Sequence, residues 1–291
     1  MNNNRKNIRL IYTCGSQQIE FSKNTKMFIT DIDGLSFNDV NINETELASQ
    51  PGSTPDNMRV KPKTLTIQGR IAENFRFRQA ILKVVTPGKM ARLRYIDDDY
   101  DIDWYIEGTP VRTPDFSNNP TWQNFQFTFH TFYPYWKDIN ETIVPFSVLV
   151  SQFMLPRSFS STEPWYIATR EQSPLQQIVN EGSADTGFIV VWEALNTVTG
   201  PRLTKVETQE TISFPELTLI AGDVLEVSTY NDNKYTRLTR EGVTTNVFGQ
   251  MDDDSTFFQL NVGNNIVRGG ADSSENSVLC QLFFNNTFVG V

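Results

Sequence analysis

The segment from Asn124 to Tyr133 alternates between polar and mainly aromatic side chains, and this pattern constrains the fold more than any other part of the chain. The mainly aromatic side consists of Phe125, Phe127, Phe129, Thr131 and Tyr133. The polar side consists of Asn124, Gln126, Thr128 and His130. Successive side chains of a strand point to opposite faces, so the segment predicts a strand whose aromatic face packs on a core. Pro134 lacks the N–H that a sheet ladder requires, and we expect the strand to end there.

Short strands around a single helix are predicted for the rest of the first half. Strand-like runs lie at residues 8–12, 26–32, 63–69, 90–95 and 103–107. Residues Glu73 to Val85 predict the helix, which Pro87-Gly88 ends. One face of this helix carries Phe77, Ala80, Ile81, Val84 and Val85, and the other carries Arg76, Gln79 and Lys83. Such an amphipathic pattern is typical of a helix that lies over a sheet.

The stretch from Asn38 to Arg59 is polar and contains the turn-forming residues Pro51-Gly52. It predicts either a long loop or an extended hairpin arm, and not a part of the core.

Strands separated by regular turn signals predict a β-sandwich for the second half. They are expected at residues 187–194, 204–206, 210–213, 216–220, 224–229, 235–240, 256–260, 265–267 and 278–285. Between Pro134 and Pro174 the sequence changes to a mixed apolar segment followed by a polar, proline-containing one. This change predicts two domains, at residues 1–140 and 141–291, which fold separately. Residues 160–291 are expected to fold when expressed alone. The fold class is therefore mainly β.

Composition argues against several classes of protein. The formal net charge is −9, whereas a protein that grips duplex DNA needs clustered Lys and Arg. No run approaches the roughly 20 apolar residues of a membrane span, and the start lacks the apolar region of a signal peptide. We therefore expect synthesis in a cytoplasm, no membrane insertion and no sequence-specific binding of nucleic acid. Cys14 and Cys280 form no CxxC pair, and reduced thiols are expected.

Catalytic chemistry has few candidate residues. His130 is the only histidine, and no GxSxG, GxxxxGK[ST] or GxGxxG segment is present. A zinc site would need more His and Cys side chains than the chain supplies at suitable spacing. The carboxylates between Asp97 and Asp103 invite a test for calcium, but the positions that would need Gly and Glu hold Ile102 and Gly108. A solvated hairpin tip is favoured there, and also at Asp252-Asp253-Asp254. We assign no catalytic, cofactor-binding or metal-binding residue, and no cofactor.

Two alternatives stay open at this point. Exposed aromatics can stack on sugar rings, and the candidates are Trp104, Trp122, Trp136, Trp165 and Trp192. Paired carboxylates for glycoside hydrolysis are defined by their spacing in three dimensions, and no pair stands out in the sequence.

A family resemblance rests on segments in a fixed order along the second half. They are Asn180-Glu181-Gly182, residues 186–188, residues 219–229, residues 255–265 and the closing Phe288-Val289-Gly290-Val291. In this order they resemble the distal tail protein (Dit) family of siphovirus-type phages. The aromatic strand ending in residues 132–136 resembles the segment that closes that family's N-terminal domain.

The resemblance implies an N-terminal β-rich ring domain, a C-terminal galectin-like β-sandwich and a homo-hexamer. This hub would join the tail tube protein to tail-tip and tail-associated proteins, with a receptor-binding protein as a further partner, in the virion. It implies a structural protein and no enzyme. The alternative is a carbohydrate-binding adhesin that contacts the host cell wall. A galectin sugar site depends on a histidine, however, and the sandwich has none.

Overall fold

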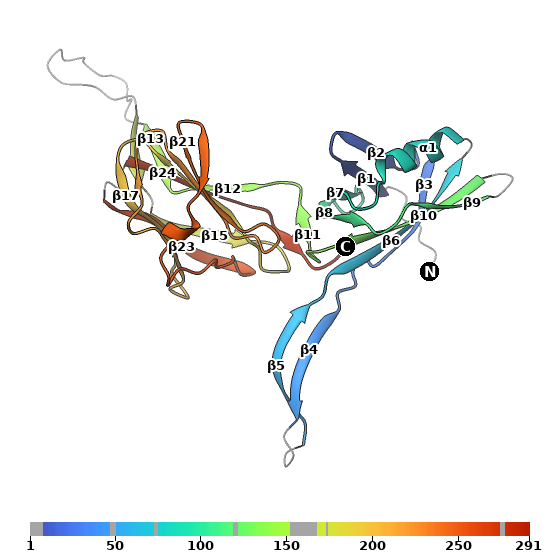
Figure 1. The fold of residues 1–291 in the computed structure, drawn as a ribbon, viewed down its shortest axis with the longest axis horizontal. Helices are drawn as coiled ribbons and strands as arrows, with labels where there is room; N and C mark the ends of the chain where they lie inside the picture. Colours follow the sequence, from blue (N-terminus) through green and yellow to red (C-terminus); the bar gives the residue numbers. More distant parts are fainter. Residues whose placement is uncertain are drawn as a thin grey trace. The chain divides into compact units, whose positions relative to one another are not determined.

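A computed structural model describes residues 8–46, 51–72, 75–118, 122–151, 168–172, 174–273 and 277–291. The chain divides into two compact units, drawn together in Figure 1. Unit 1 contains Met1–Ile139 and also Thr287–Val291, and unit 2 contains Asn140–Asn286. Contacts therefore group the last five residues with unit 1, whereas the sequence interpretation gave everything after residue 140 to the second domain. The chain is mainly β, with one α-helix among the described residues, as the sequence predicted.

Unit 1 is built on a ten-stranded antiparallel sheet. Its main path runs through β2 (Gln17–Phe21), β1 (Ile8–Cys14), β7 (Ala91–Asp97), β8 (Ile102–Pro110), β10 (Trp122–Thr131), β6 (Lys63–Ala72) and β3 (Met27–Asp33). β9 (Asp115–Asn118) pairs with β10, β11 (Trp136–Asp138) pairs with β8, and β25 (Thr287–Phe288) pairs with β11. β4 (Val40–Glu46) and β5 (Ser53–Val60) form a separate two-stranded sheet.

Strand β10 confirms the alternation seen in the sequence. Phe125, Phe127 and Phe129 are buried in the core of unit 1, where the ring of Tyr12 meets the rings of Phe127 and Phe129 edge-on at 5.9 and 6.0 Å between centroids. The pairing with β6 runs from Trp122 to Thr131, and the strand ends there. Tyr133 thus lies beyond the strand and is half-buried, which corrects its assignment to the aromatic face.

Helix α1 (Phe75–Val84) lies within the predicted range and packs against β2 and β1 (Figure 1). Its core side chains Ile81 and Val84 are buried together with Val85, and Phe77 and Ala80 pack against the same cluster. The polar side chains of the opposite face, Arg76, Gln79 and Lys83, are exposed. The prediction of an amphipathic helix over a sheet is confirmed.

Unit 2 is a β-sandwich. One sheet has the order β12 (Thr142–Pro145), β24 (Val278–Phe284), β16 (Ile189–Ala194), β20 (Val224–Ser228), β21 (Tyr235–Arg240) and β22 (Val243–Asn246). The other has the order β15 (Leu175–Asn180), β23 (Gly263–Ser273), β17 (Val198–Lys205) and β18 (Thr211–Ser213), with β19 (Thr218–Leu219) beside β17. Trp192 and Leu225 of the first sheet share one core with Leu203 and Val267 of the second. β13 (Ser147–Ser151) and β14 (Ala168–Gln172) form a separate pair, and Phe248–Gln250 is a short 3₁₀ helix.

One predicted strand of the second half is wrong. Residues 256–260 contain no strand, and only Leu260 pairs, through an isolated bridge to Thr186. Phe258 and Leu260 are nevertheless buried in the core of unit 2. Their apolar alternation therefore reflects burial of an irregular segment and not sheet pairing.

Candidate interaction surface on the β4–β5 arm

Strands β4 and β5 form an antiparallel arm that extends from unit 1 (Figure 1). The sequence left a long loop and a hairpin arm open, and the structure selects the arm. Val40 pairs with Val60 and Ile42 pairs with Met58, so these four side chains fall on one face. We call Val40, Ile42, Met58 and Val60 the apolar arm face. Ile42 is 55% exposed and Met58 is 64% exposed.

The opposite face of the same ribbon is polar. Asn41 pairs with Arg59 and Asn43 pairs with Asn57. Toward the tip the register shifts between Asn43 and Glu44, and side-chain hydrogen bonds link Thr45 to Asp56 and Ser53 to Glu44. The arm is therefore amphipathic, with its two faces set by the pairing register.

An exposed apolar arm face carries an energetic cost. Full burial of a Val, Ile or Met side chain contributes about 1.5–3 kcal/mol, so half-exposed side chains forgo roughly 1 kcal/mol each. An isolated two-stranded ribbon is also only marginally stable in water. Contiguous exposed apolar side chains bordered by polar ones are typical of protein-interaction sites. The sequence reasoning missed this face, although the spacings of Val40 to Ile42 and Met58 to Val60 signalled it.

The only histidine has a simple environment. His130 lies near the end of β10, where its Nδ1 is 3.1 Å from the hydroxyl of Thr64 on β6. Its ring meets the ring of Phe132 edge-on, at 5.3 Å between centroids. The hydroxyl of Thr64 is within hydrogen-bond distance of the imidazole, but the neighbouring ring of Phe132 is apolar and cannot orient the imidazole as the third group of a catalytic triad would.

The carboxylates between Asp97 and Asp103 are held within a β-hairpin. Asp97 is buried and accepts a hydrogen bond from the backbone N–H of Asp99 at 3.1 Å. Asp98 forms an ion pair with Arg9 at 2.8 Å, and Asp103 binds Arg94 through both carboxylate oxygens. The described segments of the chain contain no group of three or more His, Cys, Asp or Glu side chains that could hold a metal ion. Asp252, Asp253 and Asp254 are exposed.

The predicted aromatic candidates are dispersed. Trp136 and Trp192 are fully buried, in the cores of unit 1 and unit 2 respectively. Trp104 stacks on Phe288, and Trp122 is 38% exposed with the guanidinium of Arg70 at 5.1 Å from its ring centroid. Trp165 lies outside the described residues. The described tryptophans therefore do not form a common stacking platform.

The two cysteines belong to different units of the chain. Cys14 is partly buried in unit 1, and Cys280 is buried in the core of unit 2. Both are free thiols, and burial raises the pKa of Cys280 above its ordinary value. Cys280 therefore lacks the environment that lowers the pKa of a reactive cysteine.

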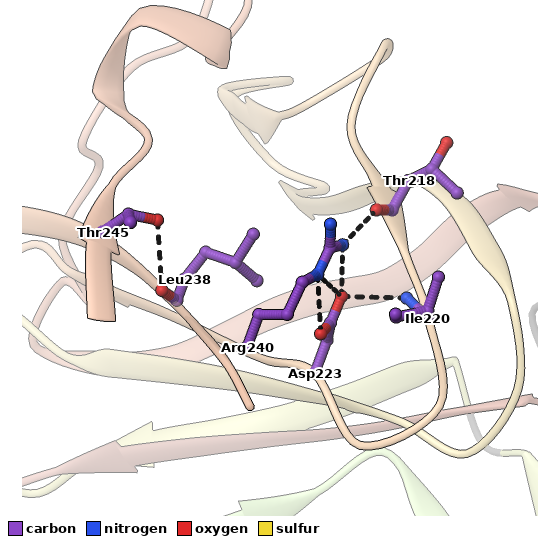
Figure 2. A network of polar contacts seen from close by, with 6 residues as sticks. All are labelled: Thr218, Ile220, Asp223, Leu238, Arg240 and Thr245. Atoms are coloured by element: carbon purple, nitrogen blue, oxygen red, sulfur yellow. Dashed lines mark hydrogen bonds and ion pairs between the residues drawn. The ribbon is translucent and has the colours of Figure 1, made fainter. Parts of the chain in front are cut away.

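A buried carboxylate with an arginine partner occurs in unit 2 (Figure 2). Arg240 on β21 binds Asp223, which directly precedes β20, and also donates to the backbone oxygen of Thr218 at 3.1 Å. The backbone N–H of Ile220 donates to the same carboxylate at 2.9 Å. These hydrogen bonds lower the pKa of Asp223 and keep it ionised. The network ties a turn to a strand, which is a structural role.

No helix in the described part of the chain is long and apolar enough to cross a membrane.

The comparisons with known proteins agree with this architecture. Residues 181–288 match the family described as siphovirus-type tail component, C-terminal domain. No curated protein matches the chain in sequence.

Among solved structures, the SPP1 Dit protein is similar to this chain with a TM-score of 0.64 and 10% identity, over 96% of this chain and 99% of that one. It is described as a hub adsorption apparatus of phages that infect Gram-positive bacteria. A chain of the phage P2 baseplate in its activated conformation has a TM-score of 0.53 and 10% identity, over 98% of this chain and 99% of that one. At these identities the likeness establishes the fold.

Proposed function

We propose that this protein is the hub at the distal end of a phage tail, because residues 181–288 match the family described as siphovirus-type tail component, C-terminal domain. The hub is a homo-hexamer that joins the tail tube to tail-tip and baseplate proteins, with a receptor-binding protein as a further partner. The protein is made and assembled in the cytoplasm of a bacterial host and functions in the virion. Its role is structural and not enzymatic.

The apolar arm face is the observation that supports assembly most directly. Ile42 and Met58 are more than half exposed, and they form a cross-strand pair on an arm that stands apart from the main sheet. A second copy of the chain is the partner we propose, because every copy in a ring would present the same arm in the same orientation to its neighbour. A head-to-tail contact of this kind produces a closed ring when the rotation closes.

The two end strands of the sheet, which an isolated bridge between Ser22 and Met27 joins at one point, provide a second reason for assembly through unit 1. Strands β2 and β3 end the main path of its sheet. Natural proteins cover such edges or pair them, since an open row of backbone N–H and C=O groups invites pairing. The number of six subunits comes from the family and not from these contacts.

The test uses light scattering over a concentration series together with negative-stain imaging of the full chain. The wild-type protein is expected to form a ring with a central hole at high concentration. Ile42→Ser combined with Met58→Ser should shift assembly to higher concentration, because it removes two apolar contacts from each arm. The matched control is Asn41→Ser combined with Asn57→Ser on the polar face, which should assemble like the wild type.

Two results would contradict the proposal. A compact monomer at the highest concentration, with no ring of this chain in assembled tails, would exclude the hub. Equal loss of assembly in the arm variant and its control would instead show that the apolar arm face is not the contact.

A further inference from the structure

Residues Thr287–Val291 leave unit 2 and form part of unit 1, and we call them the clasp segment. Its strand β25 pairs with β11, with Phe288 opposite Trp136 and Thr287 opposite Lys137. The ring of Phe288 stacks on Trp104 of β8 at 3.9 Å between centroids and 8° between planes. Thr287 is fully buried. The clasp segment therefore joins the sheet in the manner of a peptide that binds by strand addition.

Side chains of unit 1 hold the backbone of the clasp segment. The buried ammonium of Lys63 donates to the backbone oxygen of Val289 at 3.3 Å and to that of Leu35 at 2.9 Å. Asn38 also donates to the backbone oxygen of Val289, and Ser36 donates to that of Val291. The acceptors at Val289 and Val291 are main-chain oxygens, so these contacts recognise an extended peptide and not particular side chains.

Gly290 sets the one strict demand on side-chain size. A Cβ at this position would lie 2.6 Å from the Cα of Ser36. That separation is too short for two carbon atoms, and the obstacle is backbone, so any side chain must displace either the clasp segment or residue 36. The site therefore selects for an aromatic residue at the second position and glycine at the fourth.

The same contacts meet the base of the arm. Leu35, Ser36 and Asn38 lie between β3 and β4, and β4 begins at Val40. Two of these three residues bond the clasp segment directly, and Leu35 is joined to it through Lys63. The indole of Trp136, on the strand that pairs with the clasp segment, donates to the backbone oxygen of Leu35 at 3.2 Å.

We propose that unit 1 contains a strand-addition groove for an extended Thr-Phe-Val-Gly-Val peptide, and that occupation of this groove by the clasp segment fixes the base of the arm. Because residues 287–291 follow all of unit 2 in the chain, the groove is filled only after unit 2 has been synthesised. An incomplete chain then has a loosely held arm. This inference deepens the proposed function, since it makes the assembly surface conditional on a docked clasp segment.

Hydrogen exchange of the backbone amides tests the proposal on the monomer at low concentration. Two variants remove the contact: Gly290→Val in the full chain, and a chain that ends at Asn286. Both are expected to speed exchange at residues 35–42 by roughly tenfold or more, while exchange in unit 2 stays unchanged. Gly249→Val is the matched control, because a Cβ at Gly249 meets no atom within 4 Å.

Addition of a peptide in trans separates a groove from an ordinary core. Synthetic Thr-Phe-Val-Gly-Val should restore slow exchange at residues 35–42 in the shortened chain, and Thr-Phe-Val-Val-Val should not. Unchanged exchange there in both variants would overturn the proposal, as would failure of the first peptide to restore it. Equal loss of protection throughout unit 1 would also overturn it. None of these readouts requires a ring, so the result is independent of whether the hub assembles.

Discussion

Arg240 holds the carboxylate of Asp223 with its Nε 3.0 Å from each oxygen and its Nη2 2.5 Å from one of them. The Asp223 side chain is 2% exposed, whereas that of Arg240 is 43% exposed. The carboxylate of this ion pair is thus buried, whereas the guanidinium is partly exposed to water. Together with the N–H of Ile220, this pair fixes the turn that leads into β20.

Removal of the Asp223 charge should destabilise unit 2. Asp223→Asn is expected to lower the free energy of unfolding by about 1–3 kcal/mol, because it weakens several charge-assisted hydrogen bonds in a buried site. The larger loss of stability that follows when a fully buried ion pair is broken does not apply here, because the Arg240 side chain is partly exposed to water. Denaturant unfolding of the full chain measures the effect. Asp253→Asn, at an exposed position, is the control and should change little.

The same pair predicts a dependence on acid. The pKa of Asp223 is lowered in the folded state by its hydrogen bonds with Arg240. Its contribution is therefore fully present above the unfolded pKa of about 3.9, and is lost as the pH falls through the folded pKa. The stability difference between wild type and Asp223→Asn should narrow as the pH falls below about 4. A difference that is constant across this range would contradict the lowered pKa.

Lys63 predicts a second pH dependence of the same sign, in the basic range. Burial lowers the pKa of Lys63 to about 8, so the folded state binds fewer protons than the unfolded state between pH 8 and the ordinary lysine pKa of 10.5. Stability from this group therefore rises with pH across that window, by at most about 1.4 kcal/mol per pH unit. Thermal melts of wild type and Lys63→Met should diverge in favour of wild type as the pH rises. Lys89→Met, at an exposed lysine, should show no such divergence.

The division of the chain into two compact units predicts which fragment folds when it is expressed alone. Residues 140–286 are expected to give a soluble β-rich domain with one cooperative melt, because they contain every strand of both sandwich sheets. Residues 160–291, the fragment that the sequence suggested, lack β12 and the buried Phe146. They also carry residues 287–291 without their partners on β11. Circular dichroism and thermal unfolding of both fragments check this, and a more stable 160–291 fragment would contradict it.

Local patterns predicted the elements that are set by local contacts. The alternation of Phe125, Phe127 and Phe129 and the spacing along α1 each encode one buried face, and both predictions were correct. The place of Thr287–Phe288 in unit 1 depends on pairing with Trp136 and Lys137, far away in the chain. A strand of two residues is too short to show a periodic pattern, and its sequence does not indicate which strand it pairs with.

The candidate surface shows the same limit. Val40 and Ile42 lie among polar residues, as do Met58 and Val60. The composition of the whole stretch therefore predicted a polar segment. Only the register that puts Ile42 opposite Met58 gathers them on one face. A one-residue slip would have moved these side chains to different faces, and the sequence alone does not fix that register.

His130→Ala is expected to leave stability within about 0.5 kcal/mol of wild type, as for ordinary surface positions. The side chain contacts the hydroxyl of exposed Thr64 and the exposed ring of Phe132, and water can replace the hydrogen bond. The backbone of His130, unlike its side chain, is closely packed. A Cβ at Gly108 would lie 2.2 Å from the carbonyl oxygen of His130. Gly108→Ala should therefore destabilise unit 1 by about 1–3 kcal/mol through overpacking. Denaturant unfolding of the two variants compares them, and a larger loss for His130→Ala than for Gly108→Ala would show that the imidazole itself is required.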